Sequence, residues 1–214
     1  MGNLVCDAAR EEVSADFAFT NLGGIRDEIP AGPVTPRQVF KVLPFGNSLM
    51  VFEMDGRTLK EVIEYRVSAG HHGVYMSGGK VVYSKSRPDY DRVTHFEVGG
   101  EPWDPDKVYR VVTSDFLATG NAGLYMLPLI PEEKKMRTST TYMDAAVHYI
   151  ERHSPIGNTT DGRWVRDDTA EVDEIAPELT IEKTVSLDGS IPGVDLVEGT
   201  NGQIVTYSFV VSNV

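Results

Sequence analysis

The sequence has almost no cysteine, no long apolar run and no excess of basic residues. Cys6 is the only cysteine among 214 residues, so neither an intrachain disulfide nor a cysteine cluster for a metal ion can form. No apolar run approaches the roughly 18 residues that a membrane-spanning helix needs, so we expect no membrane span in this chain. The net charge is −12, and no part of the chain has the basic surplus of a nucleic-acid binder, so we expect no nucleic-acid partner.

Familiar catalytic motifs are absent too. The sequence contains no Gly-x-Ser-x-Gly nucleophile motif and no phosphate-binding P-loop. No metal-binding motif includes any of the five histidines, which are His71, His72, His95, His148 and His153. We therefore expect no catalytic residue, no bound metal and no cofactor in this chain, and its function has to be sought in residues that bind a ligand.

The acidic charge is concentrated near the C-terminus. From Asp167 to Val214 there are ten acids and one base, whereas residues 1–166 are nearly balanced. This change predicts a domain over 1–166, an acidic linker over 167–178 and a second module over 179–214. The sequence starts abruptly in a helix, and the second module ends without enough strands to close a core. We expect the chain to be a piece of a longer polypeptide.

Helix and strand patterns occur without strict alternation, which favours an α+β fold for the first domain. Apolar residues at helical spacing predict helices over residues 1–11, 35–43, 55–70 and 138–155. Alternating or apolar runs between glycine turns predict strands within residues 16–32, 48–54, 74–86 and 92–116. Thr35 is a good helix N-cap, and Pro36 suits the first helical position. Period-two alternation near the C-terminus predicts the start of an all-β module that is truncated here.

Three glycine-containing stretches carry residues suited to binding. "NLGGIR" places Asn21, Gly23, Gly24 and Arg26 in one turn, where glycine lets a ligand approach the backbone and arginine can donate two hydrogen bonds to oxygens. "LPFGN" places Phe45 beside a tight turn. "SDFLATGNAG" places Phe116 beside a third glycine loop. Each stretch alone is a weak signal, because a glycine turn is often only a turn.

Together these stretches resemble the C-terminal, substrate-binding domain of the 5′-nucleotidase and UDP-sugar hydrolase family. The resemblance covers residues 1–164 and includes the opening "GNLVCDA", then "MDGRTLKEVIE", "MSGGKVVY" and "YRVVTSDFLATG" in the family's order and spacing. It implies an α+β domain with a mixed sheet and packed helices. It also implies a nucleoside or nucleotide ligand whose base is clamped between two phenylalanines.

The resemblance implies a role for each matching residue. Phe45 and Phe116 match the clamp, and Arg26 matches the arginine on the sugar or phosphate side. The remaining matches would lie near the base or ribose. The complete substrate-binding set expected from the resemblance is Asn21, Gly23, Arg26, Phe45, Asn47, Gly78 and Phe116.

One position departs from the family pattern. The family writes Gly-Gly-Asp-Gly in the third glycine loop, where this sequence has Gly120, Asn121, Ala122 and Gly123. Ala122 therefore replaces the aspartate that accepts hydrogen bonds from ribose hydroxyls. Either the Asn121 amide substitutes as the acceptor, or the ligand is not an ordinary ribonucleoside.

The resemblance also implies what the parent protein contains. Two divalent metal ions in a separate N-terminal metallophosphoesterase domain would hydrolyse the phosphoester, so we expect this chain alone to be inactive. Relatives with the same domain pair include 2′,3′-cyclic phosphodiesterases and sulfur-compound hydrolases, and a non-catalytic ligand-binding or adhesive module is a further alternative. The C-terminal strands resemble the β-sandwich repeats of bacterial cell-surface proteins, which predicts an extracytoplasmic location: periplasmic, secreted or at the cell surface.

Overall fold

The computed structural model describes residues 1–68, 70–157 and 161–169, and the backbone of 179–187 and 205–213. The chain divides into two compact units, Met1–Ala170 and Glu171–Val214. In the second unit, β10 (Leu179–Leu187) and β11 (Val205–Asn213) pair antiparallel, in agreement with the strands expected there. Residues 170–178, which form most of the predicted linker, lie outside the described residues, and the β-sandwich repeat stays a prediction.

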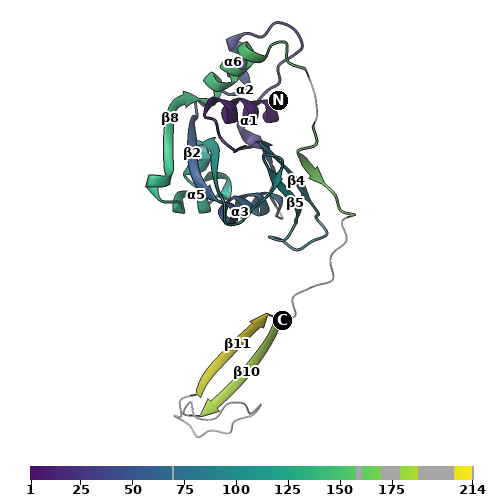
Figure 1. The fold of residues 1–214 in the computed structure, drawn as a ribbon, viewed down its shortest axis with the longest axis vertical. Helices are drawn as coiled ribbons and strands as arrows, with labels where there is room; N and C mark the ends of the chain where they lie inside the picture. Colours follow the sequence, from purple (N-terminus) through teal and green to yellow (C-terminus); the bar gives the residue numbers. More distant parts are fainter. Residues whose placement is uncertain (69, 158–160, 170–178, 188–204, 214) are drawn as a thin grey trace. The chain divides into compact units, whose positions relative to one another are not determined.

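The first unit combines helices with two sheets (Figure 1). Its α-helices are α1 (Gly2–Glu12), α2 (Pro36–Val42), α3 (Gly56–Val67), α4 (Asp115–Ala118), α5 (Met126–Leu129) and α6 (Tyr142–His153). The five-stranded sheet has the order β3 (Val74–Ser77), β1 (Phe17–Asn21), β7 (Val108–Ser114), β2 (Ser48–Asp55) and β8 (Lys135–Thr141). The four-stranded sheet has the order β6 (Glu101–Pro102), β5 (Val93–Val98), β4 (Gly79–Tyr83) and β9 (Trp164–Arg166). The predicted α+β fold with a mixed sheet and packed helices is confirmed.

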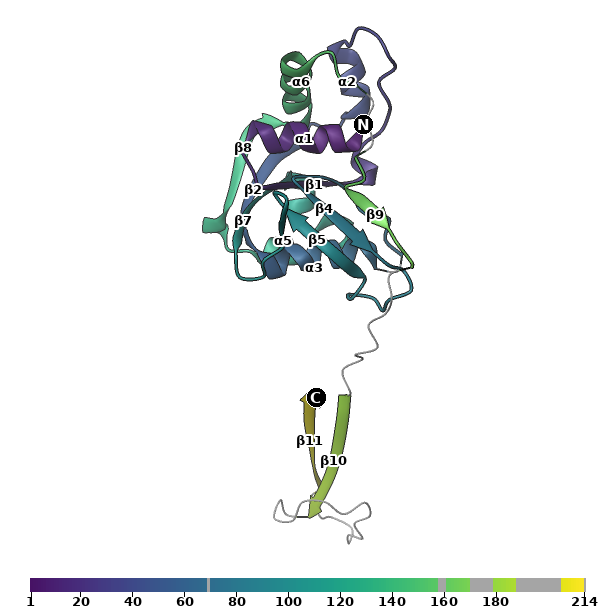
Figure 2. The same cartoon turned by 45° about the vertical axis from the view of Figure 1, so that its right-hand side comes forward.

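Helices cover both faces of the five-stranded sheet. Figure 2 shows α1, α2 and α6 on one face and α3 and α5 on the other. Successive residues of a strand point to opposite faces, so Phe17 and Phe19 of β1 enter the core with α3 and α5, while Ala18 between them enters the core with α1, α2 and α6. Two separate hydrophobic clusters therefore hold this sheet in place.

The strand directions bring five strand ends to one edge of this sheet. β1 and β7 are parallel, so their C-terminal ends lie together. β3 is antiparallel to β1, and β2 is antiparallel to β7, so both of these strands begin at that edge. β8 is antiparallel to β2 and ends there. This edge is the end of the sheet at which strands begin or stop, not one of its outer strands, and we call it the ligand edge. Along it lie the residues that follow β1, β7 and β8 and those that precede β2 and β3.

Local capping signals explain where the helices begin. Thr35 and Gln38 form the capping box at α2, as the sequence predicts for this N-terminus. The helix predicted over 138–155 starts later than expected, because residues 138–141 belong to β8 and α6 begins at Tyr142. These residues are threonine and serine, which fit a strand paired with β2. Thr141 then caps α6 in a box with Asp144.

Candidate functional site

The turn between α2 and β2 carries the first predicted aromatic residue. Gly46 has φ +62°, a left-handed conformation that glycine adopts without strain, and it turns the chain sharply between Phe45 and Asn47. The Phe45 ring is 57% exposed, so one of its faces is open to a ligand. The Asn47 carbonyl accepts a hydrogen bond from the Tyr142 amide at 3.0 Å, which joins the turn to the start of α6.

The "NLGGIR" turn follows β1 directly at the ligand edge. The Arg26 amide donates to the Val42 carbonyl at the end of α2, with a distance of 3.0 Å. This bond places the Arg26 guanidinium 5.8 Å from the centre of the Phe45 ring, within the range of a cation–π contact. One guanidinium nitrogen donates to the Gly23 carbonyl at 3.2 Å. Within the described part of the chain this is the only hydrogen bond of the Arg26 side chain, so its other donors face solvent.

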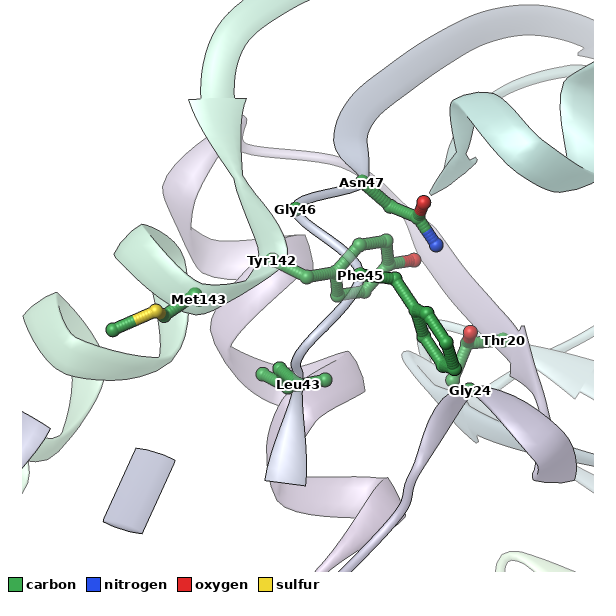
Figure 3. A pocket seen from close by; sticks show the side chains of 8 residues that line it. All are labelled: Thr20, Gly24, Leu43, Phe45, Gly46, Asn47, Tyr142 and Met143. Carbon is green, nitrogen blue, oxygen red and sulfur yellow. The ribbon is translucent and has the colours of Figure 1, made fainter. Parts of the chain in front are cut away.

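A pocket lies where these two turns meet (Figure 3). Its lining residues are Thr20, Gly24, Leu43, Phe45, Gly46, Asn47, Tyr142 and Met143. Burial raises the pKa of the Tyr142 phenol well above its usual range, and its hydroxyl donates to the Phe19 carbonyl at 3.3 Å. Tyr142 therefore stays neutral and forms a fixed wall behind the Phe45 ring.

The loop that follows β7 carries the second predicted aromatic residue. Ser114 caps α4 by accepting a hydrogen bond from the Leu117 amide at 3.1 Å. In the first turn of this short helix, the Phe116 ring is 43% exposed. The Asn121 side chain donates to the Phe116 carbonyl at 3.0 Å and to the Thr119 hydroxyl at 2.9 Å. Both amide protons of Asn121 are thus used within the loop, which leaves its side-chain oxygen as an acceptor.

Ala122 has a left-handed backbone conformation, which alanine seldom adopts. Its φ of +56° and ψ of +23° are left-handed, a region where aspartate and asparagine are several-fold enriched over other non-glycine residues. The buried Arg66 of α3 donates to the Ala122 carbonyl at 2.9 Å and to the Gly73 carbonyl at 3.0 Å. On Gly123, a Cβ atom would lie 1.9 Å from the Tyr65 hydroxyl, so the loop packs closely on α3. The backbone at Ala122 is therefore one that aspartate or asparagine adopts more readily than alanine does.

The structure gathers most, but not all, of the predicted binding residues. Asn21 ends β1, Gly23 and Arg26 follow it, Phe45 and Asn47 precede β2, and Phe116 follows β7, all at the ligand edge. Gly78 does not join them. It follows Ser77, which pairs with Ala18 near the start of β1, whereas Val74 at the other end of β3 pairs with Asn21.

Gly78 therefore lies at the opposite edge of the sheet, in a second pocket with Asp7, Arg10 and Arg163. Gly24, which the sequence places in the same turn as Gly23, lines the first pocket, whereas sequence reasoning missed Thr20 and Tyr142. Thr20 immediately precedes the "NLGGIR" segment and could have been included on that ground. Tyr142 gave no such signal, because its position depends on the pairing of β8 with β2.

Comparison with known proteins decides the family. The family described as 5′-nucleotidase, C-terminal domain, matches residues 1–128, which is more than half of the chain. The chain belongs to this family. Among curated relatives, protein UshA of Escherichia coli is 35% identical over 162 residues, and protein UshA of Yersinia enterocolitica is 33% identical over 162 residues. Each alignment covers 73% of this chain and 28% of the relative, so the chain spans little more than a quarter of these proteins.

A solved structure has a fold similar to that of this domain. The 5′-nucleotidase precursor from Thermus thermophilus superimposes with a TM-score of 0.70 and 30% sequence identity, covering 77% of this chain and 34% of that one. Among the residues described here, no group of three or more histidine, cysteine, aspartate or glutamate side chains is placed to hold a metal ion. In the same residues, no helix has the length and apolar character needed to cross a membrane.

Proposed function

We propose that this domain holds a nucleoside or nucleotide by clamping its base between Phe45 and Phe116. The observation that carries the proposal is the pair of exposed rings, 57% and 43% accessible, in two loops at the same edge of the sheet. Stacking of a base on an aromatic side chain contributes about 1–3 kcal/mol and tolerates different bases. A pair of rings left in water by the fold is suited to that role.

Polar groups around the rings support the same proposal. The Arg26 guanidinium has free donors beside Phe45 and suits the sugar or phosphate oxygens. The side-chain amides of Asn21 and Asn47 form no hydrogen bond with the described residues, and both are partly exposed at the ligand edge. Gly23 is exposed in the same turn, where its backbone is open to a ligand. Gly78 is left out of the proposed site because of its place at the opposite edge.

In the parent protein, this domain would present the phosphoester to a separate N-terminal metallophosphoesterase domain with two divalent metal ions. The similarity to 5′-nucleotidases supports hydrolysis of a phosphoester by the whole protein. The residues of this chain bind and orient the substrate, and the chain alone is expected to be inactive. We further propose an extracytoplasmic location and the division into 1–166, a linker over 167–178 and a β-sandwich repeat from 179.

Calorimetric titration of the chain with adenosine, uridine and AMP tests the proposal. We expect each ligand to bind, since stacking tolerates different bases, and AMP to bind more tightly than adenosine because Arg26 can pair with phosphate. Absence of heat with all three ligands, for a chain whose circular dichroism spectrum is that of a folded α+β protein, would contradict the proposed clamp.

Restoring the missing carboxylate is a second test. In Ala122→Asp, we expect affinity for adenosine to rise by about ten- to a hundredfold, because a charged acceptor for ribose hydroxyls contributes about 1.5–3 kcal/mol. The left-handed backbone at this position accommodates aspartate, so folding should be preserved. Free adenine lacks the ribose and serves as the control ligand, with affinity unchanged. An equal change for adenine and adenosine would show that the substitution acts on something other than ribose recognition.

A non-catalytic binding module is the second candidate, and Ala122 is the observation that favours it. A domain that no longer binds ribose hydroxyls through a carboxylate could have passed to another ligand. The sequence upstream in the parent protein separates the two candidates. Intact Asp-x-His, Asn-His-Glu or Asn-His-Asp, and His-x-His motifs would favour the enzyme, and eroded motifs would favour the binding module.

A further inference from the structure

One arginine side chain, that of Arg137, contacts both loops that carry the phenylalanine rings. Arg137 of β8 donates from Nη2 to Asp115 Oδ2 at 2.8 Å, and the same nitrogen lies 3.3 Å from the Ser48 hydroxyl. Asp115 immediately precedes Phe116, and Ser48 immediately follows Asn47 in the turn that carries Phe45. The Arg137 side chain therefore bridges the two sides of the proposed clamp.

The sheet explains how an arginine from β8 reaches both loops. β2 lies between β7 and β8, and Arg137 pairs with Met50 near the start of β2. From there its side chain extends along the ligand edge to the end of β7, where Asp115 begins α4. The ion pair consequently lies along the strand ends between the two aromatic loops.

The carboxylate in this pair is recessed and only partly used. The Asp115 side chain is 25% exposed, whereas the Arg137 side chain is 65% exposed. Asp115 Oδ2 accepts from Arg137, but Oδ1 accepts no hydrogen bond from any residue that the structure describes. Ion pairs with one exposed partner add little to stability, so fold stability gives no strong reason for this arrangement. A recessed carboxylate oxygen without a donor is suited to a donor on a ligand.

We propose that Asp115 reads the edge of the clamped base by accepting a hydrogen bond from its exocyclic amino group, with Arg137 as the positioning residue. This inference rests on the proposed clamp. Arg137 contacts Asp115, next to Phe116, and Ser48, close to Phe45, so the pair is bonded to both of the loops that would surround a base held between the two rings. An ionised carboxylate is an acceptor only, so it favours amino groups such as those of adenine and cytosine and disfavours a carbonyl at the same position.

Titration with adenosine and inosine tests this assignment, because a carboxylate placed opposite the exocyclic group meets an amino donor in adenosine and a carbonyl acceptor in inosine. Inosine also carries a proton on N1, so purine riboside, which lacks the exocyclic group and the N1 proton, is titrated beside it and should bind as weakly as inosine. We expect the chain to bind adenosine about tenfold more tightly than inosine, as for a hydrogen bond to a charged acceptor. In Asp115→Asn the side-chain amide can either donate or accept, so the adenosine-to-inosine ratio should fall to near one. Arg137→Gln removes the anchor of the carboxylate and should also reduce the ratio while leaving folding intact.

A matched control and two contrary results make the test decisive. Asp106→Asn breaks another exposed aspartate–arginine pair, with Arg57 on α3, and should leave the ratio unchanged. A ratio near one in the unaltered chain, or a ratio that Asp115→Asn does not alter, would overturn the role of Asp115 while leaving the clamp in place. If a folded chain binds neither nucleoside, the clamp itself fails and this inference fails with it.

Discussion

Replacement of Phe116 by alanine is expected to weaken adenosine binding by about one to two orders of magnitude. Loss of one stacking surface removes about 1–3 kcal/mol from the binding free energy, and each 1.4 kcal/mol is tenfold in affinity. The ring is 43% exposed in the absence of ligand, so its loss should hardly alter the free energy of unfolding. Calorimetric titration of the chain and its variant, with thermal unfolding of both, measures the two effects separately.

Phe40 provides a matched control for this prediction. It is also a phenylalanine, it is 52% exposed, and it lies on α2 outside the residues that line the pocket. Phe40→Ala should therefore bind adenosine as the unaltered chain does. If both variants lose affinity equally, the loss comes from a general effect on folding or solubility, and if neither loses affinity, Phe116 does not contact the base.

Local signals in the sequence were sufficient for the elements that they control directly. Thr35 followed by Pro36 marks the start of α2 because capping depends only on neighbouring residues. The same reasoning was wrong at residues 138–141, where threonines and a serine could serve either as the lead-in to a helix or as a strand. Pairing with β2 decides the matter, and that partner is almost ninety residues away.

The residues of the candidate site likewise include some that the sequence predicts and others that only the fold brings together. The phenylalanines and Arg26 stand beside glycine turns that the sequence displays, and the family resemblance supplied the reason to group them. Their common position follows from the parallel pairing of β1 with β7, which periodicity does not reveal. Gly78 was included because the family resemblance matches it to a lining position, but the register of β3 with β1 places it at the opposite edge. Arg137 was missed because only the sheet order places it near Asp115.

Substitution of Arg66 is expected to have a second large effect, on the free energy of unfolding. The residue is 7% exposed, and its guanidinium donates to carbonyls of two loops, at Gly73 and Ala122. Burial lowers its pKa from the usual range, which indicates that its charge is partly removed from water. Hydrogen bonds to a charged donor contribute about 1.5–3 kcal/mol each, and a carbonyl left buried without a donor adds a further penalty. This residue holds the loop that contains Ala122 against α3.

Arg66→Met is therefore expected to lower the free energy of unfolding by roughly 3 kcal/mol, seen as a fall of about 10 °C in Tm. Methionine retains much of the side-chain volume, so the loss reports the hydrogen bonds more than a cavity. Arg57→Met on the same helix is the matched control, because Arg57 is exposed and its pair with Asp106 should contribute less than about 1 kcal/mol. Equal destabilisation by the two substitutions would contradict the role of Arg66. A larger loss in Arg66→Met, together with weaker adenosine binding, would mean that the anchoring of the Ala122 loop stabilises both the fold and the Phe116 side of the proposed clamp.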